Sequence, residues 1–294
     1  MVAGEHFQIS FSGITLGFTQ PEVPFTLPEE FSALLCLENH EPDAEYEIVL
    51  IHTPLTLTEP VHYSYCGIDL YQTEEGWLRV HPLRCEDTGC QVACLLRPDG
   101  RHRLFYPASL WERYANPLHC AHLMGLETVL IRKNAFLLHS SVVMLEGKTI
   151  LFFGPSGVGK STQARLWQQH LGAEILNGDR CVIMQKEGGF HGGGSPLAGT
   201  SGIYRRDQAP IGAIFMLEQT DHCQATPLGA AALAPMLGQT LLNSWDRAFM
   251  DSLLTLYQQL LVQVPVYRLQ CLPDETAVAL AYQIAFPKNG PEEA

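Results

Sequence analysis

The fold of this chain is decided by one stretch, Gly154-Pro155-Ser156-Gly157-Val158-Gly159-Lys160-Ser161-Thr162. The stretch matches the pattern G-x-x-x-x-G-K-S/T of a phosphate-binding loop, the Walker A motif. Glycines allow backbone turns that a Cβ hinders, so that consecutive N–H groups can surround phosphate oxygens. We expect Lys160 to bring a mobile positive charge to the phosphates and the Ser161 hydroxyl to ligate Mg²⁺. The expected nucleotide-binding residues are Gly154, Ser156, Gly157, Val158, Gly159, Lys160, Ser161 and Thr162.

The flanks of this stretch have the strand–loop–helix pattern that the motif requires. Residues 149–153 form a short apolar run of β-forming residues, which predicts a buried strand. After the loop, Ala164, Trp167 and Leu171 recur at helical spacing and predict a helix with one buried face. A chance match in a glycine-rich turn would lack these neighbours, so we interpret the stretch as a phosphate loop.

Length and composition describe an ordinary folded protein. The chain has 294 residues, of which 46% are hydrophobic and 17% charged, enough for one large domain or two smaller ones. The net charge of −13 argues against a nucleic-acid partner, which usually requires a basic face. We find neither a signal peptide nor an apolar stretch of the roughly 18 residues that a membrane span requires. We therefore expect a cytoplasmic protein that binds neither nucleic acid nor a membrane.

Nine cysteines and twelve histidines raise the question of a metal site. The main cysteine cluster, formed by Cys85, Cys90 and Cys94, lacks the tight C-x-x-C spacing of zinc sites. Free thiols are the default in a reducing compartment. We therefore favour free thiols over a metal site.

The pattern of the first 115 residues differs from that of the rest. Alternating residues separated by Pro and Gly predict short strands near residues 7–11, 46–50, 77–80 and 104–106. This part shows no chemical constellation, so it either packs against the catalytic part or presents a substrate. The predicted organisation is a β-rich N-terminal domain (1–115), a linking helix (116–135), a catalytic domain (136–287) and a flexible tail (288–294).

A hairpin is predicted to lead directly into the phosphate loop. Residues 136–145 have the pattern of a strand, and Glu146-Gly147-Lys148 forms a tight turn before the strand 149–153. Common phosphate-loop proteins reach this strand through parallel crossovers instead. We therefore predict an α/β fold whose sheet is mixed.

Two residues near the predicted loop could carry chemistry. Asp179 follows the next strand, where a carboxylate could hold Mg²⁺, although a plain turn residue would look the same. His139 lies on the strand paired with the phosphate-loop strand, where a buried core histidine is the alternative. Arg205 and Arg206 follow the glycine-rich run 192–202, which either closes over the γ-phosphate as a lid or lies solvated on the surface.

Four segments together resemble the catalytic domain of HPr kinase/phosphorylase: Leu138-His139-Ser140-Ser141, the turn at Gly147, the phosphate loop and Asn177-Gly178-Asp179-Arg180. The resemblance covers residues 130–285, with its strong motifs confined to 139–180, and looks closest to small bacterial HPr-kinase-like proteins. It implies the mixed-sheet fold shared with ATP-dependent phosphoenolpyruvate carboxykinase. It also implies ATP and Mg²⁺ as cofactors, and self-association into a homo-oligomer.

The resemblance implies a kinase that transfers the γ-phosphoryl group of ATP to a hydroxyl of an unknown peptide, protein or small molecule. The sequence departs from the family at Gly178, which replaces the first of two adjacent aspartates, the proposed base. Asp179 and His139 remain open as the base. Two alternatives are a nucleotide-binding regulator without catalysis and a carboxykinase-type reaction, for which a second set of metal ligands is not recognisable. The catalytic residues of the leading hypothesis are Lys160, Asp179, His139, Arg205 and Arg206, and its metal ligands are Ser161 and Asp179.

Overall fold

The computed structural model divides the chain into two compact units, Met1–Val129 and Leu130–Ala294. The boundary lies within the segment 116–135, for which the sequence predicts a linking helix. In that segment α3 spans Leu126–Ile131 and β9 begins at Ala135, while residues 115–120 and 122 lie outside the described part. The predicted tail 288–294 lies outside it as well. The structure describes residues 6–19, 29–37, 40–65, 67–82, 91–114, 121 and 123–287.

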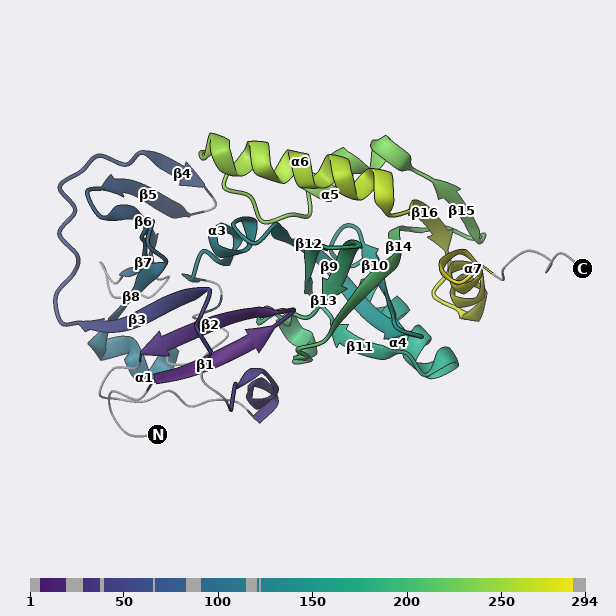
Figure 1. Cartoon of the computed structure of the whole chain (residues 1–294), viewed down its shortest axis with the longest axis horizontal. Helices are drawn as coiled ribbons and strands as arrows, with labels where there is room; N and C mark the ends of the chain where they lie inside the picture. The colour runs from purple at the N-terminus through teal and green to yellow at the C-terminus, as the bar shows by residue number, and fades with distance from the viewer. Residues whose placement is uncertain are drawn as a thin grey trace, which may run out of the picture. The chain divides into compact units, whose positions relative to one another are not determined.

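The first unit is built on one sheet, which has eight strands within the described residues, in the order β1-β2-β3-β8-β7-β6-β5-β4 (Figure 1). Adjacent strands are antiparallel except for the parallel pairs β2–β3 and β3–β8. Buried Ala44, Tyr46 and Ile48 alternate with exposed residues on β3, as a strand with one covered face requires. The elements are β1 His6–Phe11, β2 Ile14–Thr19, η1 Glu29–Leu34, β3 Ala44–Ile51, β4 Tyr63–Tyr65, β5 Ile68–Thr73, β6 Gly76–Pro82, β7 Gln91–Leu96, β8 Arg101–Pro107, η2 Ala108–Leu110 and α1 Trp111–Tyr114.

A buried ion pair joins β6 to α3 within the first unit. Nη1 of Arg79 donates to Oε1 of Glu127 at 2.5 Å, and the two side chains are only 8% and 7% exposed. A buried charge that loses its partner is costly, so each of these residues depends on the other.

The second unit contains a mixed sheet. Strands follow the order β10-β9-β12-β13-β14-β16-β15, with β11 paired to β9 and an additional pairing between β10 and β14. The hairpin β9–β10 is antiparallel, whereas β14 is parallel to both β10 and β16. The α/β class and the mixed sheet expected from the sequence are therefore confirmed. The strands are β9 Ala135–Leu145, β10 Lys148–Phe153, β11 Glu174–Asn177, β12 Arg180–Lys186, β13 Gly189–Gly193, β14 Gln208–Gln219, β15 Gln224–Pro227 and β16 Val266–Cys271.

Two long strands bend this sheet upon itself. The first half of β9 pairs with β12, and its second half pairs with β10 and β11. In the same way β14 pairs first with β13 and then with β10 and β16. The pairings β9–β12–β13–β14–β10–β9 form a closed ring, which fixes the end of β10 relative to β14.

Helices cover both faces of this sheet, with α4 and α6 on opposite sides (Figure 1). Trp167 of α4 packs edge-on against Phe152 of β10 at a centroid distance of 5.7 Å, which holds this helix beside the loop strand. Asp246 and Asp274 cap α6 and α7 by accepting backbone N–H bonds at their first turns. Within the described ranges, we find no helix with the length and apolar character to cross a membrane. The helical elements are α4 Lys160–Leu171, η3 Gly199–Ser201, η4 Gly229–Ala232, α5 Leu233–Leu237, α6 Arg247–Gln263 and α7 Glu275–Ala285.

Candidate functional site

The segment between β10 and α4 presents its backbone to solvent. Gly154, Gly157 and Gly159 have φ angles of 146°, 81° and 107°, in the region that side chains with a Cβ disfavour. A Cβ on Gly154 would also lie 3.3 Å from the carbonyl oxygen of Leu217 on β14. In the segment, Pro155, Ser156 and Gly157 are exposed, Val158 is half-buried and Gly154 is buried; Ser161 and Thr162, at the start of α4, are also exposed. Strand, glycine loop and helix thus follow one another in the order that an anion-binding loop needs.

Lys160 turns its side chain back into this loop. Its Nζ donates to the carbonyl oxygens of Gly154 at 3.0 Å and Pro155 at 3.1 Å, and the residue is only 7% exposed. Burial lowers the pKa of Lys160, an effect that the charge of Asp179 opposes and that of Arg180 reinforces. Neutral carbonyl oxygens are weaker partners for an ammonium group than phosphate oxygens. The lysine is therefore held where an incoming phosphate can replace its present acceptors.

Asn177 shapes the turn that carries the candidate carboxylate. Its Oδ1 accepts hydrogen bonds from the backbone N–H groups of Asp179 at 2.8 Å and Arg180 at 2.9 Å, while its Nδ2 donates to Ser195 O. Asn177 is fully buried, and Ser140 N donates to Asp179 O at 3.0 Å. These bonds fix the turn between β11 and β12 against β9.

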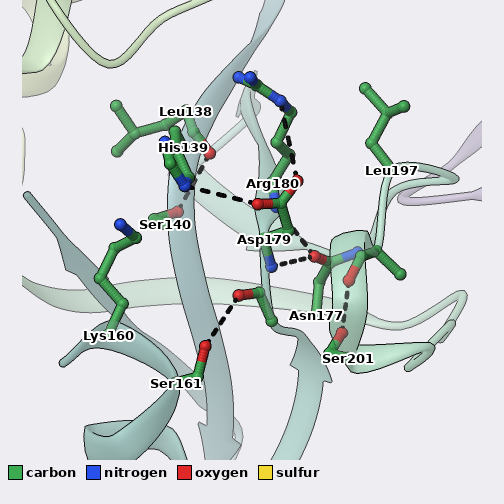
Figure 2. A network of polar contacts seen from close by, with 12 residues as sticks. Leu138, His139, Ser140, Lys160, Ser161, Asn177, Asp179, Arg180, Leu197 and Ser201 are labelled. Atoms are coloured by element: carbon green, nitrogen blue, oxygen red, sulfur yellow. Dashed lines mark hydrogen bonds and ion pairs between the residues drawn. The ribbon is translucent and has the colours of Figure 1, made fainter. Parts of the chain in front are cut away.

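Asp179 and His139 point toward each other across this turn, as Figure 2 shows. Nε2 of His139 lies 3.4 Å from Oδ1 of Asp179, and Nε of Arg180 lies 3.9 Å from the other oxygen. Burial is the main cause that lowers the pKa of His139, and Lys160 and Arg180 lower it further against the opposing charge of Asp179. His139 is thus neutral at pH 7, and a neutral imidazole can accept a proton.

Gly178 is required by close packing at the same turn. A Cβ placed there would lie 2.6 Å from Cβ and 2.7 Å from Oγ of Ser201, on the short helix η3. Across the same contact, a Cβ on Gly199 would lie 2.8 Å from Cβ of Asp179. The carbonyl oxygen of Gly178 accepts a long hydrogen bond of 3.4 Å from Ser161 Oγ. Gly178, where the sequence departs from the HPr kinase pattern, is therefore held between η3 and the start of α4.

The structure brings four of the sequence-predicted residues together: Lys160, Ser161, Asp179 and His139.

Arg205 lies away from these four residues. Nε of Arg205 is 3.0 Å from Oε1 of Glu174, and its Nη1 donates to Tyr204 O. Glu174 begins β11 and Asn177 ends it, which separates this pair from the carboxylate turn by roughly 10 Å. Arg206 is exposed, and residues 192–198 of the predicted lid are buried. Closure of this segment over a phosphate stays a prediction.

Arg180 and Gln219 are site residues that the sequence reasoning missed. Arg180 lies opposite His139 in the β9–β12 register, and no sequence signal predicts that register. Gln219 ends β14 and donates its Nε2 to the outer carbonyl oxygens of Gly157 at 3.4 Å and Val158 at 3.3 Å. The sequence did contain one signal for Gln219: it is a polar residue at the end of a buried strand, and such strand ends often carry binding residues.

The donor groups at the loop fit a hard cation better than zinc. Ser161 and Asp179 offer a hydroxyl and a carboxylate, which are ligand types of Mg²⁺. Among the described residues, we find no group of three or more His, Cys, Asp or Glu that could hold a metal. Cys85 and Cys90 lie outside the described residues, and Cys94 is buried.

Comparisons with known proteins identify one family. A family model described as SynChlorMet cassette protein ScmC matches residues 120–272, slightly more than half of the chain. No curated protein matches the sequence. Among solved structures, the Hpr(Ser) kinase/phosphatase from Coxiella burnetii is similar at a TM-score of 0.27 and 10% identity, over 49% of this chain and 90% of that chain. A likeness of this degree carries no conclusion about activity.

Proposed function

The chain belongs to the ScmC family, and we propose that it is an ATP-dependent phosphotransferase that transfers the γ-phosphoryl group to a hydroxyl of a peptide, a protein or a small molecule. The observation that supports this most is the pair of Asp179 and His139 beside Lys160, which lies folded into a glycine loop. A phosphate-binding loop and a group that can accept a proton are the two parts that such a transfer needs.

We propose that the loop 154–162 binds the phosphates of ATP. Its exposed backbone N–H groups would receive phosphate oxygens, and Nζ of Lys160 would exchange the carbonyl oxygens of Gly154 and Pro155 for them. Gln219 already donates to the carbonyl oxygens of Gly157 and Val158, which would hold this part of the loop in place while a ligand binds. We expect the loop to bind the phosphates in this way without a change in its backbone conformation.

We assign the base to His139 and its orientation to Asp179. The acceptor hydroxyl would give its proton to the ring nitrogen of His139 that does not face Asp179, as its oxygen bonds to the γ-phosphorus and the bond to ADP breaks. Oδ1 of Asp179 holds the imidazole and would stabilise the imidazolium that forms. The lowered pKa of His139 keeps the ring available as a base at neutral pH.

Mg²⁺ fits the oxygen donors of Ser161 and Asp179, which would hold it. When bound, this ion would offset the negative charge of the phosphates during transfer. The two oxygens of Asp179 lie 3.4 Å from His139 and 3.9 Å from Arg180, so we expect the carboxylate to give up one of these contacts when the metal binds.

The test is transfer of label from γ-labelled ATP by the purified protein, alone and with a bacterial extract, compared with Lys160→Ala. We expect Lys160→Ala to lose transfer by about a hundredfold or more, because an electrostatic contact made in the transition state is removed. Lys186→Ala, which changes an exposed lysine at the end of β12, is the matched control and should keep full transfer. Undiminished transfer by Lys160→Ala would refute the proposal.

A nucleotide-binding regulator without catalysis is the competing function, and Gly178 is the observation that favours it. The position lacks a carboxylate, and Ser201 fills the space into which a side chain would extend. Saturable ATP binding that Lys160→Ala abolishes, without transfer to water or to any extract component, would favour the regulator.

A further inference from the structure

Cys223 and Cys271 lie opposite each other where β15 pairs with β16. Gln224 pairs with Gln270 in the antiparallel register, so one further step places Cys223 across from Cys271. Leu228 N donates to Val266 O, which makes that pair a hydrogen-bonded one. Hydrogen-bonded and non-hydrogen-bonded pairs alternate, so the cysteines occupy a non-hydrogen-bonded position.

The spacing of such a position suits a disulfide. Opposite residues at non-hydrogen-bonded positions have Cα atoms about 4.5 Å apart, within the range of about 4.4–6.8 Å that disulfides span. Both cysteines pack into the apolar cluster beneath α4 and α7, so their side chains point to the same face of the sheet. The two sulfur atoms can therefore meet without a shift of the strands.

The two thiols differ in their accessibility. Cys271 is 6% exposed, whereas Cys223 is half-buried. Burial raises the pKa of Cys271 to about 11, and the neighbouring Cys223 contributes to the rise. We therefore expect an oxidant to react first with Cys223. Cys271 would then react with the oxidised sulfur of Cys223.

We propose that Cys223 and Cys271 form a site of reversible oxidation, closed to a disulfide by a peroxide and reopened by a dithiol. The thiolate of Cys223 attacks the peroxide, whose O–O bond breaks to give water and a sulfenic acid. The sulfur of Cys271 then attacks the sulfenic sulfur, the S–S bond forms, and the hydroxyl group leaves as water with the proton of Cys271. The peroxide gains two electrons, which the two thiols lose.

Cys271 is connected to the phosphate loop through two glutamines. Nε2 of Gln163, in the first turn of α4, lies 3.6 Å from Cys271 Sγ. Gln163 is 2% exposed, and within the described part of the chain its Oε1 has no hydrogen-bond partner. On the other side, Cys271 pairs in register with Gln219, which donates to Gly157 O and Val158 O. We expect a disulfide to draw the sulfur toward Cys223 and to weaken its contact with Nε2 of Gln163, a buried amide whose Oε1 already has no partner among the described residues.

We therefore expect oxidation to weaken nucleotide binding, a step that rests on the proposed function. The affinity for ATP should fall by about tenfold, the factor that corresponds to one buried polar group left without a partner.

The disulfide itself is tested by peptide mapping after treatment with hydrogen peroxide. Trypsin cleavage after Arg206, Arg247, Arg268 and Lys288 yields the peptides 207–247 and 269–288, each with one of the two cysteines. We expect a linked pair of these peptides that dithiothreitol separates. Cys223→Ser should abolish the link, and Cys36→Ser in the first unit should leave it intact. Alkylation of both thiols after peroxide treatment, or a link to any other cysteine, would overturn the proposal.

The coupling is tested by titration of the reduced and the oxidised protein with ATP. We expect the affinity to fall on oxidation, to return on reduction, and to be insensitive to peroxide in Cys223→Ser. Formation of the disulfide without a change in affinity would overturn the coupling. A reduced protein that binds no ATP would instead contradict the proposed function, and the peptide map would still decide the fate of the thiol pair.

Discussion

Gly178→Ala adds one methyl group where the structure leaves no room for it. The new Cβ would lie 2.6 Å and 2.7 Å from two atoms of Ser201. Gly178 is not among the residues with positive φ, so alanine brings no backbone strain and its cost is steric. Insertion of a methyl group into a well-packed site costs about 1–3 kcal/mol. Each kcal/mol lowers the Tm of a unit of this size by about 2–4 °C.

The assay is thermal unfolding of four proteins: the wild type, Gly178→Ala, Ser201→Gly and the double variant. Ser201→Gly removes both atoms that the methyl group would contact, so alanine at position 178 should then cost less than about 0.5 kcal/mol. Gly238→Ala is the control, because its added Cβ would meet nothing closer than 3.6 Å. An equal loss of Tm with and without Ser201 would refute the steric reasoning.

Three further predictions concern other parts of the chain. Acidification should lower kcat/KM as His139 takes up a proton. This should occur at a pH below 6.5, the ordinary pKa of a histidine, because the pKa of His139 is lowered. His139→Gln should remove this acidic limb of the pH profile. Folding stability should fall as the pH drops from about 6.5 toward the lowered pKa of the folded state, because the unfolded chain takes up that proton at a higher pH than the folded chain does. Glu127→Ala should reduce the free energy of unfolding by about 3–5 kcal/mol, measured in urea, because Arg79 stays buried without its carboxylate; Glu47→Ala, at an exposed pair, should have little effect. Asp179→Asn should raise the Mg²⁺ concentration for half-maximal transfer by about tenfold or more, measured by metal titration.

Each of these predictions has a contrary result. An acidic limb that persists in His139→Gln would assign the base to another group. Equal losses of stability in the Glu127 and Glu47 variants would show that the buried ion pair contributes no more to the free energy of unfolding than the exposed one. An unchanged metal titration in Asp179→Asn would remove this residue from the metal site.

Local patterns in the sequence predicted the fold class, because the hairpin before the loop depends on neighbouring residues alone. The strand pattern of 136–145 and the turn at Gly147 are enough to indicate that the two strands run antiparallel. The closed ring of pairings was not predictable in this way, since it depends on contacts between segments far apart in the chain. Thr149 pairs with Ile211, and only the folded sheet makes this register visible.

The site residues that belong to a sequence motif could be predicted. Those whose position depends on tertiary packing could not. Lys160 and Asp179 follow from the motif and its next strand, and the structure places both beside His139. Arg205 has a chemistry that suits a phosphate, yet its guanidinium pairs with Glu174, a partner that no spacing rule predicts. The contact between Gly178 and Ser201 arises from tertiary packing and has no counterpart in the sequence pattern.

The closed ring has a consequence for the order of folding. The hairpin of β9 and β10 joins residues adjacent in the chain, so its loop-closure entropy is small. The parallel pairing of β10 with β14 must close a much longer segment, and such non-local contacts slow folding. During synthesis, the motif at 154–162 leaves the ribosome well before Leu217 and Gln219, which lie against it in the folded state. We therefore expect the loop to reach its folded arrangement only after β14 has been synthesised, well after the motif itself has left the ribosome.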